Sequence, residues 1–246
     1  MEQPDVARLR VKLFADGAEL SVIQKMAANP LIKGFTTNPT LMRKAGIADY
    51  AMFARDVIAA VPDRPISFEV FSDEFDEMAA QARQIASWGG NVFVKIPVTN
   101  TRGEFAGALI RDLASAGVQL NVTALLTVEQ VERVAECLSP NVASYVSVFA
   151  GRIADTGRDP MPIMARSVAL LRSLPAAELI WASPRELLNV FQADEVGCHV
   201  ITATNDVLGK LGLVGKDLAQ FSLETVQMFR QDALAAGFTI HTTAGV

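Results

Sequence analysis

The sequence predicts an α/β fold, a single (β/α)8 barrel spanning residues 1–246 with an additional C-terminal helix. Eight short apolar runs alternate with helix-like stretches along the chain, a pattern typical of parallel strands joined by right-handed crossovers. The length of 246 residues also fits one such TIM barrel, which takes about 250 residues. An open doubly wound sheet is the second choice, because eight strands are enough to close the sheet on itself.

The predicted strands are short runs rich in β-branched and aromatic residues, as expected for parallel strands buried on both faces. In chain order they cover residues 13–16, 34–38, 66–70, 92–97, 120–124, 145–149, 179–183 and 199–202. Pro97 marks the end of the fourth strand, because proline has no N–H group to continue a ladder.

The predicted helices lie between these strands, at residues 48–60, 73–88, 102–116, 128–138, 160–174 and 185–193. Gly117 ends the third helix, and Thr127 with Gln130 forms the Thr-x-x-Gln capping box that begins the fourth. A last helix at 217–236 carries apolar residues at helical spacing. That helix could close the bottom of the barrel or pack on a neighbouring subunit, and the sequence leaves both open.

Composition argues against several classes of protein. The net charge of -5, from 22 basic and 27 acidic residues, and the lack of a Lys/Arg cluster argue against a nucleic-acid-binding surface. No apolar stretch approaches the roughly 20 residues of a membrane span, and the first residues lack the features of a signal peptide. Cys137 and Cys198 do not suggest a disulfide framework, so we expect reduced core thiols and a cytoplasmic protein.

The most informative residue is Lys95, which stands in the apolar run 93–97. Lysine is rarely buried without a reason. Burial disfavours the charged form, so an amine in such a strand can become the neutral nucleophile that attacks a carbonyl carbon. The competing interpretation is an ordinary lysine at a strand end whose ammonium reaches solvent.

Polar side chains also stand at the ends of the other predicted strands. In a barrel these ends meet at one face, where the chemistry of this fold takes place. Each residue alone has a structural alternative, such as a helix cap at Asp16 or Asn38, a surface carboxylate at Glu69, or a β-former at Thr123. Together they predict a site containing an amine, carboxylates, neutral donors and, at Arg152 and Arg185, a place for a phosphate. The candidate residues are Asp16, Thr36, Asn38, Glu69, Lys95, Asn121, Thr123, Ser147, Ser183 and the two arginines.

The segments that carry these residues resemble, in order, the motifs of the transaldolase family. They are residues 34–41 (GFTTNPTL), 94–97 (VKIP), 121–126 (NVTALL), 149–152 (FAGR) and 182–185 (ASPR). The resemblance implies a class I aldolase chemistry on a TIM barrel, with a Schiff base on a lysine. It further implies small sugar phosphates as partners, no metal and no other cofactor, and a homo-oligomer, since small members are often pentamers or decamers.

The resemblance also implies a role for each matching residue. Lys95 would form the Schiff base, Asp16 would be the acid and base at the cleaved bond, and Glu69 with Thr123 would hold a water molecule that relays protons. The remaining positions would bind the substrate: Asn38 and Asn121 at the three-carbon donor unit, Ser183, Arg185 and Arg152 at the acceptor phosphate, and Thr36, Ser147 and Phe149 elsewhere in the site.

Two residues favour transfer over simple cleavage. The fructose 6-phosphate aldolases of the family typically carry Gln at the Glu69 position and Tyr at the Phe149 position. Phe149 has no hydroxyl to protonate the bound carbanion, so the resemblance favours a transferase, with aldolase cleavage that releases dihydroxyacetone as the alternative. The sequence also departs from the family's usual residues at Gly17, Val148 and Pro184, which concerns the acceptor more than the Schiff base.

Rival functions of other classes remain open. A lysine in a barrel can carry pyridoxal phosphate, and a relative without activity could bind sugar phosphates only. A zinc-dependent aldolase is disfavoured because His199 and His241 stand far apart and no carboxylate cluster has metal-ligand spacing.

Overall fold

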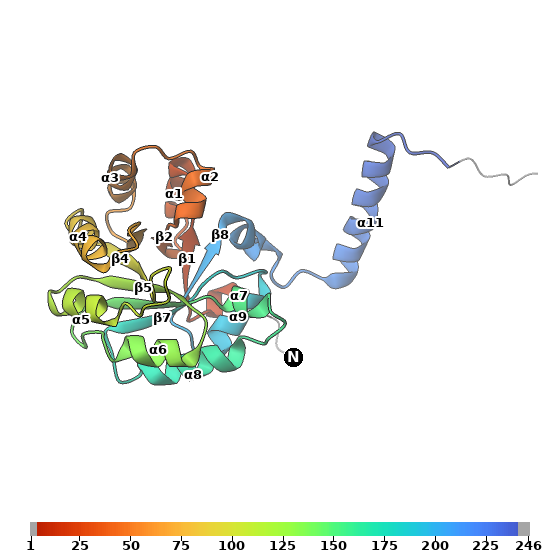
Figure 1. The fold of residues 1–246 in the computed structure, drawn as a ribbon. Helices are drawn as coiled ribbons and strands as arrows, with labels where there is room; N and C mark the ends of the chain where they lie inside the picture. The colour runs from red at the N-terminus through yellow and green to blue at the C-terminus, as the bar shows by residue number, and fades with distance from the viewer. Residues whose placement is uncertain (1–3, 241–246) are drawn as a thin grey trace, which may run out of the picture.

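In the computed structural model, which describes residues 4–240, eight parallel strands close into a barrel in the order β1 to β8 (Figure 1). The predicted (β/α)8 barrel is therefore confirmed. The strands are β1 Lys12–Asp16, β2 Ile32–Thr36, β3 Ile66–Glu69, β4 Val92–Pro97, β5 Leu120–Leu125, β6 Ser144–Val148, β7 Ala177–Trp181 and β8 Val200–Thr204.

Helices surround the barrel, except for α11, and each helix begins or ends close to a predicted boundary except where the helix is short. They are α1 Leu20–Ala27, α2 Pro39–Lys44, α3 Tyr50–Ala60, α4 Phe75–Ala86, α5 Gly107–Ser115, α6 Val128–Ala135, α7 Ala150–Ala154, α8 Met161–Leu171, α9 Leu188–Glu195, α10 Asn205–Leu208 and α11 Leu218–Ala235. Two 3-10 turns, η1 Val6–Arg8 and η2 Gly209–Leu213, complete the elements.

Local capping explains several of these boundaries. The capping box at the start of α6 is present as predicted: the Thr127 side chain accepts from the Gln130 N–H, and the Gln130 side chain accepts from the Thr127 N–H. The sequence analysis did not predict α2, which begins at Pro39 after the Asn38 side chain has capped it. A helix cap at Asn38 was the structural alternative for that residue, and proline is favourable at the first helical position that follows it.

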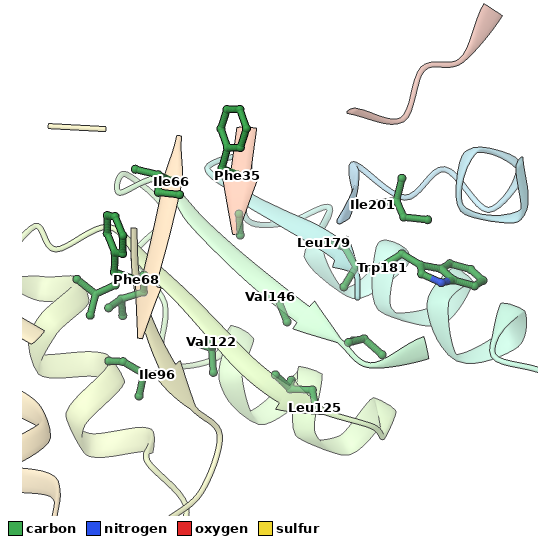
Figure 2. Close-up of a cluster of buried hydrophobic side chains, with 14 of the residues drawn as sticks. Phe35, Ile66, Phe68, Ile96, Val122, Leu125, Val146, Leu179, Trp181 and Ile201 are labelled. Atoms are coloured by element: carbon green, nitrogen blue, oxygen red, sulfur yellow. The ribbon is translucent and has the colours of Figure 1, made fainter. Parts of the chain in front are cut away.

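The main core lies between the strands and the helices. Outward-facing side chains of the strands fill it, including Phe68, Val122 and Trp181, all of them fully buried (Figure 2). Burying a side chain of this kind stabilises the fold by about 1.5–3 kcal/mol. Cys137 and Cys198 are buried free thiols, as predicted.

A smaller apolar cluster lies inside the barrel, formed by the side chains that alternate with the outward-facing ones. We name it the barrel plug, and it consists of Phe14, Phe93, Tyr145, Ile180, Ala182 and Val200, with Phe149 packed against it. Gly34 leaves room for this plug, because a Cβ atom at that position would lie 2.5 Å from the Phe14 ring. Below the plug, the Lys12 ammonium donates to both Glu178 oxygens at 2.6 Å.

The C-terminal helix α11 lies where the prediction placed it, but it does not close the bottom of the barrel. None of its residues is buried, and in Figure 1 it stands apart from the rest of the chain. Its exposed apolar side chains include Leu218, Phe221, Val226 and Phe229. Among residues 4–240, no helix is long and apolar enough to cross a membrane.

Candidate active site

A pocket with a volume of about 490 Å³ opens at the C-terminal ends of the strands. We call it the mouth pocket. All of the predicted site residues line it except Asn121, and Thr202 of β8 lines it as well. The predicted set consists of Asp16, Thr36, Asn38, Glu69, Lys95, Thr123, Ser147, Phe149, Arg152, Ser183 and Arg185 together with the buried Asn121. Parallel strands bring these distant residues together because their C-terminal ends meet at one face.

Lys95 is almost fully buried, with 7% of its surface exposed. Its Nζ atom donates to the Thr37 carbonyl at 3.0 Å and lies 3.3 Å from Glu69 Oε2. The strand fixes this position, since β3 and β4 pair with Glu69 directly opposite Lys95. The amine is therefore held at the wall of the mouth pocket by one carbonyl and one carboxylate.

Asp16 lies at the end of β1, and the polar side chains of β2 and of the following turn orient its carboxylate. Thr36 Oγ1 donates to Asp16 Oδ1 at 2.7 Å, and Asn38 Nδ2 donates to Oδ2 at 3.3 Å. Burial raises the pKa of the Asp16 carboxyl above its ordinary value, and the nearby Lys95 with these two donors offsets part of that rise. A carboxylate with a raised pKa is a stronger base, which suits it to accept and return a proton.

Beneath the pocket surface, Asn121 belongs to a buried network of neutral groups. Its Nδ2 atom donates to Ser67 Oγ at 2.9 Å, and its Oδ1 atom accepts from Ser147 Oγ at 2.7 Å. Thr123, two residues further along β5, is also buried, and its Oγ1 atom has no hydrogen-bond partner within residues 4–240. An unpaired buried hydroxyl at the wall of a pocket is available to a bound molecule.

Two residues that line the pocket have left-handed backbone conformations, with φ of 66° at Ala124 and 61° at Ser183. Such a conformation is unfavourable for residues other than glycine and is often found at functional sites. At Ser183 it turns the chain just beyond the end of β7. The extended strand direction therefore does not continue from β7 to Arg185.

The two arginines lie at the rim and differ in their partners. The Arg185 guanidinium forms a two-point ion pair with Asp155, in which Nε donates to Oδ1 at 2.8 Å and Nη2 donates to Oδ2. Its Nη1 atom donates to the Ser183 carbonyl and hydroxyl oxygens. Arg152 instead stands over the Phe149 ring, 5.4 Å from its centre. Both arginines line the mouth pocket, although Arg185 already has an anionic partner.

A model of the transaldolase/fructose-6-phosphate aldolase family matches residues 13–243. The chain belongs to this family. Among its transaldolase-family relatives, a protein named probable transaldolase from Dehalococcoides mccartyi is 34% identical over 199 residues, covering 80% of this chain and 88% of the relative. Another of that name, from a Thermoanaerobacter species, is 33% identical over 231 residues, covering 94% of this chain and 100% of the relative.

Solved structures resemble the chain in fold alone. A dihydrodipicolinate synthase from Rhodopseudomonas palustris has a TM-score of 0.55 at 13% identity, covering 91% of this chain and 81% of that one. An aldolase/citrate lyase family protein from Burkholderia cenocepacia has a TM-score of 0.56 at 16% identity, covering 92% and 98%.

Three contributors to the site of this transaldolase-family chain were missed by the sequence analysis. Thr202 Oγ1 lies 2.6 Å from Thr36 Oγ1, and the rule that polar residues stand at strand ends could have found it. Thr37 acts through its backbone carbonyl, which no side-chain pattern reveals. Asp155 lies 30 residues from Arg185 in the chain, so only the folded structure shows the pair.

The histidines lie outside this arrangement. His199 accepts a hydrogen bond from the Leu179 N–H at Nδ1, beside the start of β8. His241 lies outside the described residues. Within residues 4–240, no group of three or more His, Cys, Asp or Glu side chains is arranged to hold a metal ion.

Proposed function

We propose that the protein is a transaldolase, which moves a dihydroxyacetone unit from a ketose phosphate to an aldose phosphate through a Schiff base on Lys95. The observation that carries the proposal is the buried Lys95 amine, 3.3 Å from Glu69 at the wall of a pocket that also contains Asp16. Membership of the family and the names of the relatives support this choice of reaction.

In the first step, the Lys95 amine attacks the ketone carbon of the donor sugar. The amine must be neutral to do so, and the Glu69 carboxylate is placed to take its proton. A water molecule then leaves and a C=N iminium bond forms. The unpaired Thr123 hydroxyl, together with Glu69, can hold that water as it leaves and later returns.

In the second step, the Asp16 carboxylate takes the proton from the hydroxyl group on the distal carbon of the bond that breaks, which is the carbon that becomes the aldehyde. The carbon–carbon bond opens, an aldehyde leaves, and the bonding electron pair moves to the iminium to give an enamine. The enamine then attacks the acceptor aldehyde, and Asp16 returns its proton to the new hydroxyl. The raised pKa of Asp16 serves both directions of this transfer.

The choice between transfer and release depends on whether the enamine is protonated. Phe149 lines the pocket without a hydroxyl group, and its ring helps to keep bulk water away. We expect transfer from fructose 6-phosphate to erythrose 4-phosphate to outrun the release of free dihydroxyacetone by orders of magnitude. Rapid release in the absence of an acceptor would instead make the protein an aldolase, the second candidate function. Phe149→Tyr should increase release.

The phosphate of the acceptor is assigned to the rim of the pocket. Arg152 and Arg185 provide two positive charges there, and the Ser183 hydroxyl accepts a hydrogen bond from Arg185. Asp155 reduces the net charge of this group, so a phosphate must compete with it for Arg185.

The exposed helix α11 supports a homo-oligomer. Its apolar side chains are exposed in the structure of residues 4–240, and burial against another copy of the chain would remove them from water. Light scattering on the full chain and on a version ending at residue 216 would test this. The shortened chain should form an assembly with fewer subunits. A cytoplasmic location fits the two buried free thiols.

One experiment tests the central proposal. The protein is incubated with fructose 6-phosphate, reduced with borohydride and digested, and a three-carbon adduct should be found on the peptide that contains Lys95. A chromophore in the visible range would point to pyridoxal phosphate instead. Binding of the sugar without any adduct would indicate an inactive relative. Addition of EDTA should leave turnover unchanged, because the iminium accepts the electrons that a metal ion would otherwise accept.

A further inference from the structure

The backbone around Glu69 contains an interruption that no role assigned so far explains. Strands β2 and β3 pair in register at Phe35–Ile66 and Thr36–Ser67, and the Thr37 N–H donates to the Ser67 carbonyl at 3.2 Å. Continuing this parallel ladder would pair the Glu69 N–H with the Thr37 carbonyl. The ladder stops there because the chain turns at Asn38 into α2.

A tyrosine side chain takes the place of the missing strand. The Glu69 N–H donates to the Tyr50 hydroxyl at 2.8 Å, and the same hydroxyl donates to the Glu69 carbonyl at 3.0 Å. Both backbone groups of Glu69 that face β2 are thus satisfied by one side chain of α3, which matters because buried backbone groups need partners.

Because Tyr50 binds the Glu69 N–H, the Thr37 carbonyl lacks its ladder partner and accepts a hydrogen bond from Lys95 instead. Lys95 Nζ donates to that carbonyl at 3.0 Å. The same amine lies 3.3 Å from the Glu69 carboxylate, whose backbone Tyr50 holds. The position of the nucleophile therefore depends on two atoms, the Thr37 carbonyl oxygen and Glu69 Oε2. The Tyr50 hydroxyl binds the Glu69 backbone N–H that would otherwise pair with that Thr37 carbonyl.

We infer that Tyr50 is a positioning residue for the reaction at Lys95: its hydroxyl opens the β2–β3 edge so that Glu69 and Thr37 both reach the amine. The inference rests on the proposed Schiff-base function. A packing role alone would need the ring and not the hydroxyl.

The surroundings of Tyr50 suit this role. The ring packs against Phe68, Phe71 and Trp88, with centres 6.0, 4.6 and 5.5 Å away, and Tyr50 is the first residue of α3, which the Asp49 side chain caps. Burial raises the pKa of the phenol, and its hydrogen bond with Glu69 only partly offsets this. The hydroxyl therefore stays protonated at neutral pH and can donate and accept at the same time.

The test removes one oxygen atom. Tyr50→Phe keeps the ring, and Tyr145→Phe is the matched control, because Tyr145 is the only other tyrosine in the chain and belongs to the barrel plug. For the unaltered protein and both variants we would measure thermal unfolding, kcat and KM with fructose 6-phosphate and erythrose 4-phosphate, and the single-turnover rate of borohydride trapping at Lys95.

We expect Tyr50→Phe to lower kcat and the trapping rate about tenfold, because both hydrogen bonds of the hydroxyl with the Glu69 backbone are lost, with KM changed less than about twofold. Tyr145→Phe should leave kcat within about twofold. Equal kcat and trapping rates in the two variants, or a rise in KM that follows a loss of thermal stability, would overturn the inference while leaving the proposed function intact. Absence of a trapped adduct in the unaltered protein would overturn the proposed function itself.

Discussion

The barrel contains a lysine beside a glutamate at each end, and the two pairs differ in burial and geometry. At the N-terminal end, the Lys12 ammonium contacts both Glu178 oxygens at 2.6 Å, and the two side chains are 42% and 28% exposed. At the C-terminal end, Lys95 lies 3.3 Å from one Glu69 oxygen, and the exposed fractions are 8% and 16%. The barrel plug lies between the two pairs.

The difference shows that residue types alone do not define a catalytic pair. A partly exposed ion pair with two short contacts has satisfied charges, and it contributes little beyond local stability. A buried pair with one longer contact is less well compensated, and its amine borders a pocket large enough for a substrate. Substitutions matched between the two ends can therefore separate chemistry from structure.

The largest effect is expected from Lys95→Arg. Arginine keeps the positive charge but holds no neutral amine at working pH, so turnover and adduct formation should vanish. Lys12→Arg makes the same change at the other end and should leave turnover nearly unaltered. The two variants are compared in one transfer assay, and normal activity of the Lys95 variant would refute the Schiff base.

The next largest effect is expected from Asp16→Asn, which should lower kcat by roughly 10²–10⁴-fold because the proton acceptor is lost. In the unaltered protein, the acid side of the kcat/KM profile should fall at a higher pH than an ordinary aspartate would give, since burial raises the pKa of Asp16. Glu178→Gln is the control at the other end, and a comparable loss there would show that the effect is structural.

Asp16→Asn should also change the thermal stability of the protein, in a direction that follows from the raised pKa of Asp16. Because the pKa of Asp16 is raised in the folded state, its contribution favours folding at low pH and is lost as pH rises through the folded-state pKa. Asp16→Asn should therefore unfold at a higher temperature than the unaltered protein at pH 7, and this advantage should disappear below about pH 4. Thermal unfolding at several pH values measures it, and a variant less stable at pH 7 would contradict the reasoning.

Substitutions in the barrel plug, which lies between the two pairs, should lower the free energy of unfolding. Phe14 is buried, with 1% exposed, and Phe14→Ala would leave a cavity and cost about 3–5 kcal/mol of unfolding free energy. Denaturant titration checks this. A cost below about 1 kcal/mol would mean that the interior collapses around the missing ring.

The smallest effect in this series is expected at the rim. Arg152→Ala should lower kcat/KM for phosphorylated acceptors by roughly 10- to 150-fold, and Arg185→Ala should act in the same direction. Acceptors without a phosphate should be affected much less. An equal loss for both kinds of acceptor would show that the arginines have a structural role.

The barrel could be predicted from the sequence because its short apolar strands are recognisable from local residues, and because the chain length fits one barrel. Lys95 and Asp16 were predicted as site residues for the same reason, since Lys95 stands inside one recognisable strand and Asp16 ends another. The helices α1 and α2 were not predicted, because eight and six residues give little periodicity, whereas α6, of the same length as α1, also has a capping box that marks its start.

Other parts of the site depend on contacts that no local pattern records. Asn121 stays a predicted substrate-binding residue, and only the folded structure shows that its side chain is fully buried in a network with Ser67 and Ser147. The left-handed turn at Ser183 could not be predicted, because the usual sequence signal for this conformation is a glycine and residue 183 is a serine. The partnership of Tyr50 with Glu69 joins an α-helix to a strand 19 residues away.

The contact between Phe14 and Gly34 also limits how this sequence can change over evolutionary time. A methyl group at residue 34 would overlap the aromatic ring, so alanine there is harmful as long as phenylalanine occupies position 14. With a smaller residue at position 14, the same alanine would fill space instead of clashing. The two substitutions are therefore not independent, and the order in which they arise matters. Phe14 must be replaced by a smaller residue before residue 34 can carry a side chain.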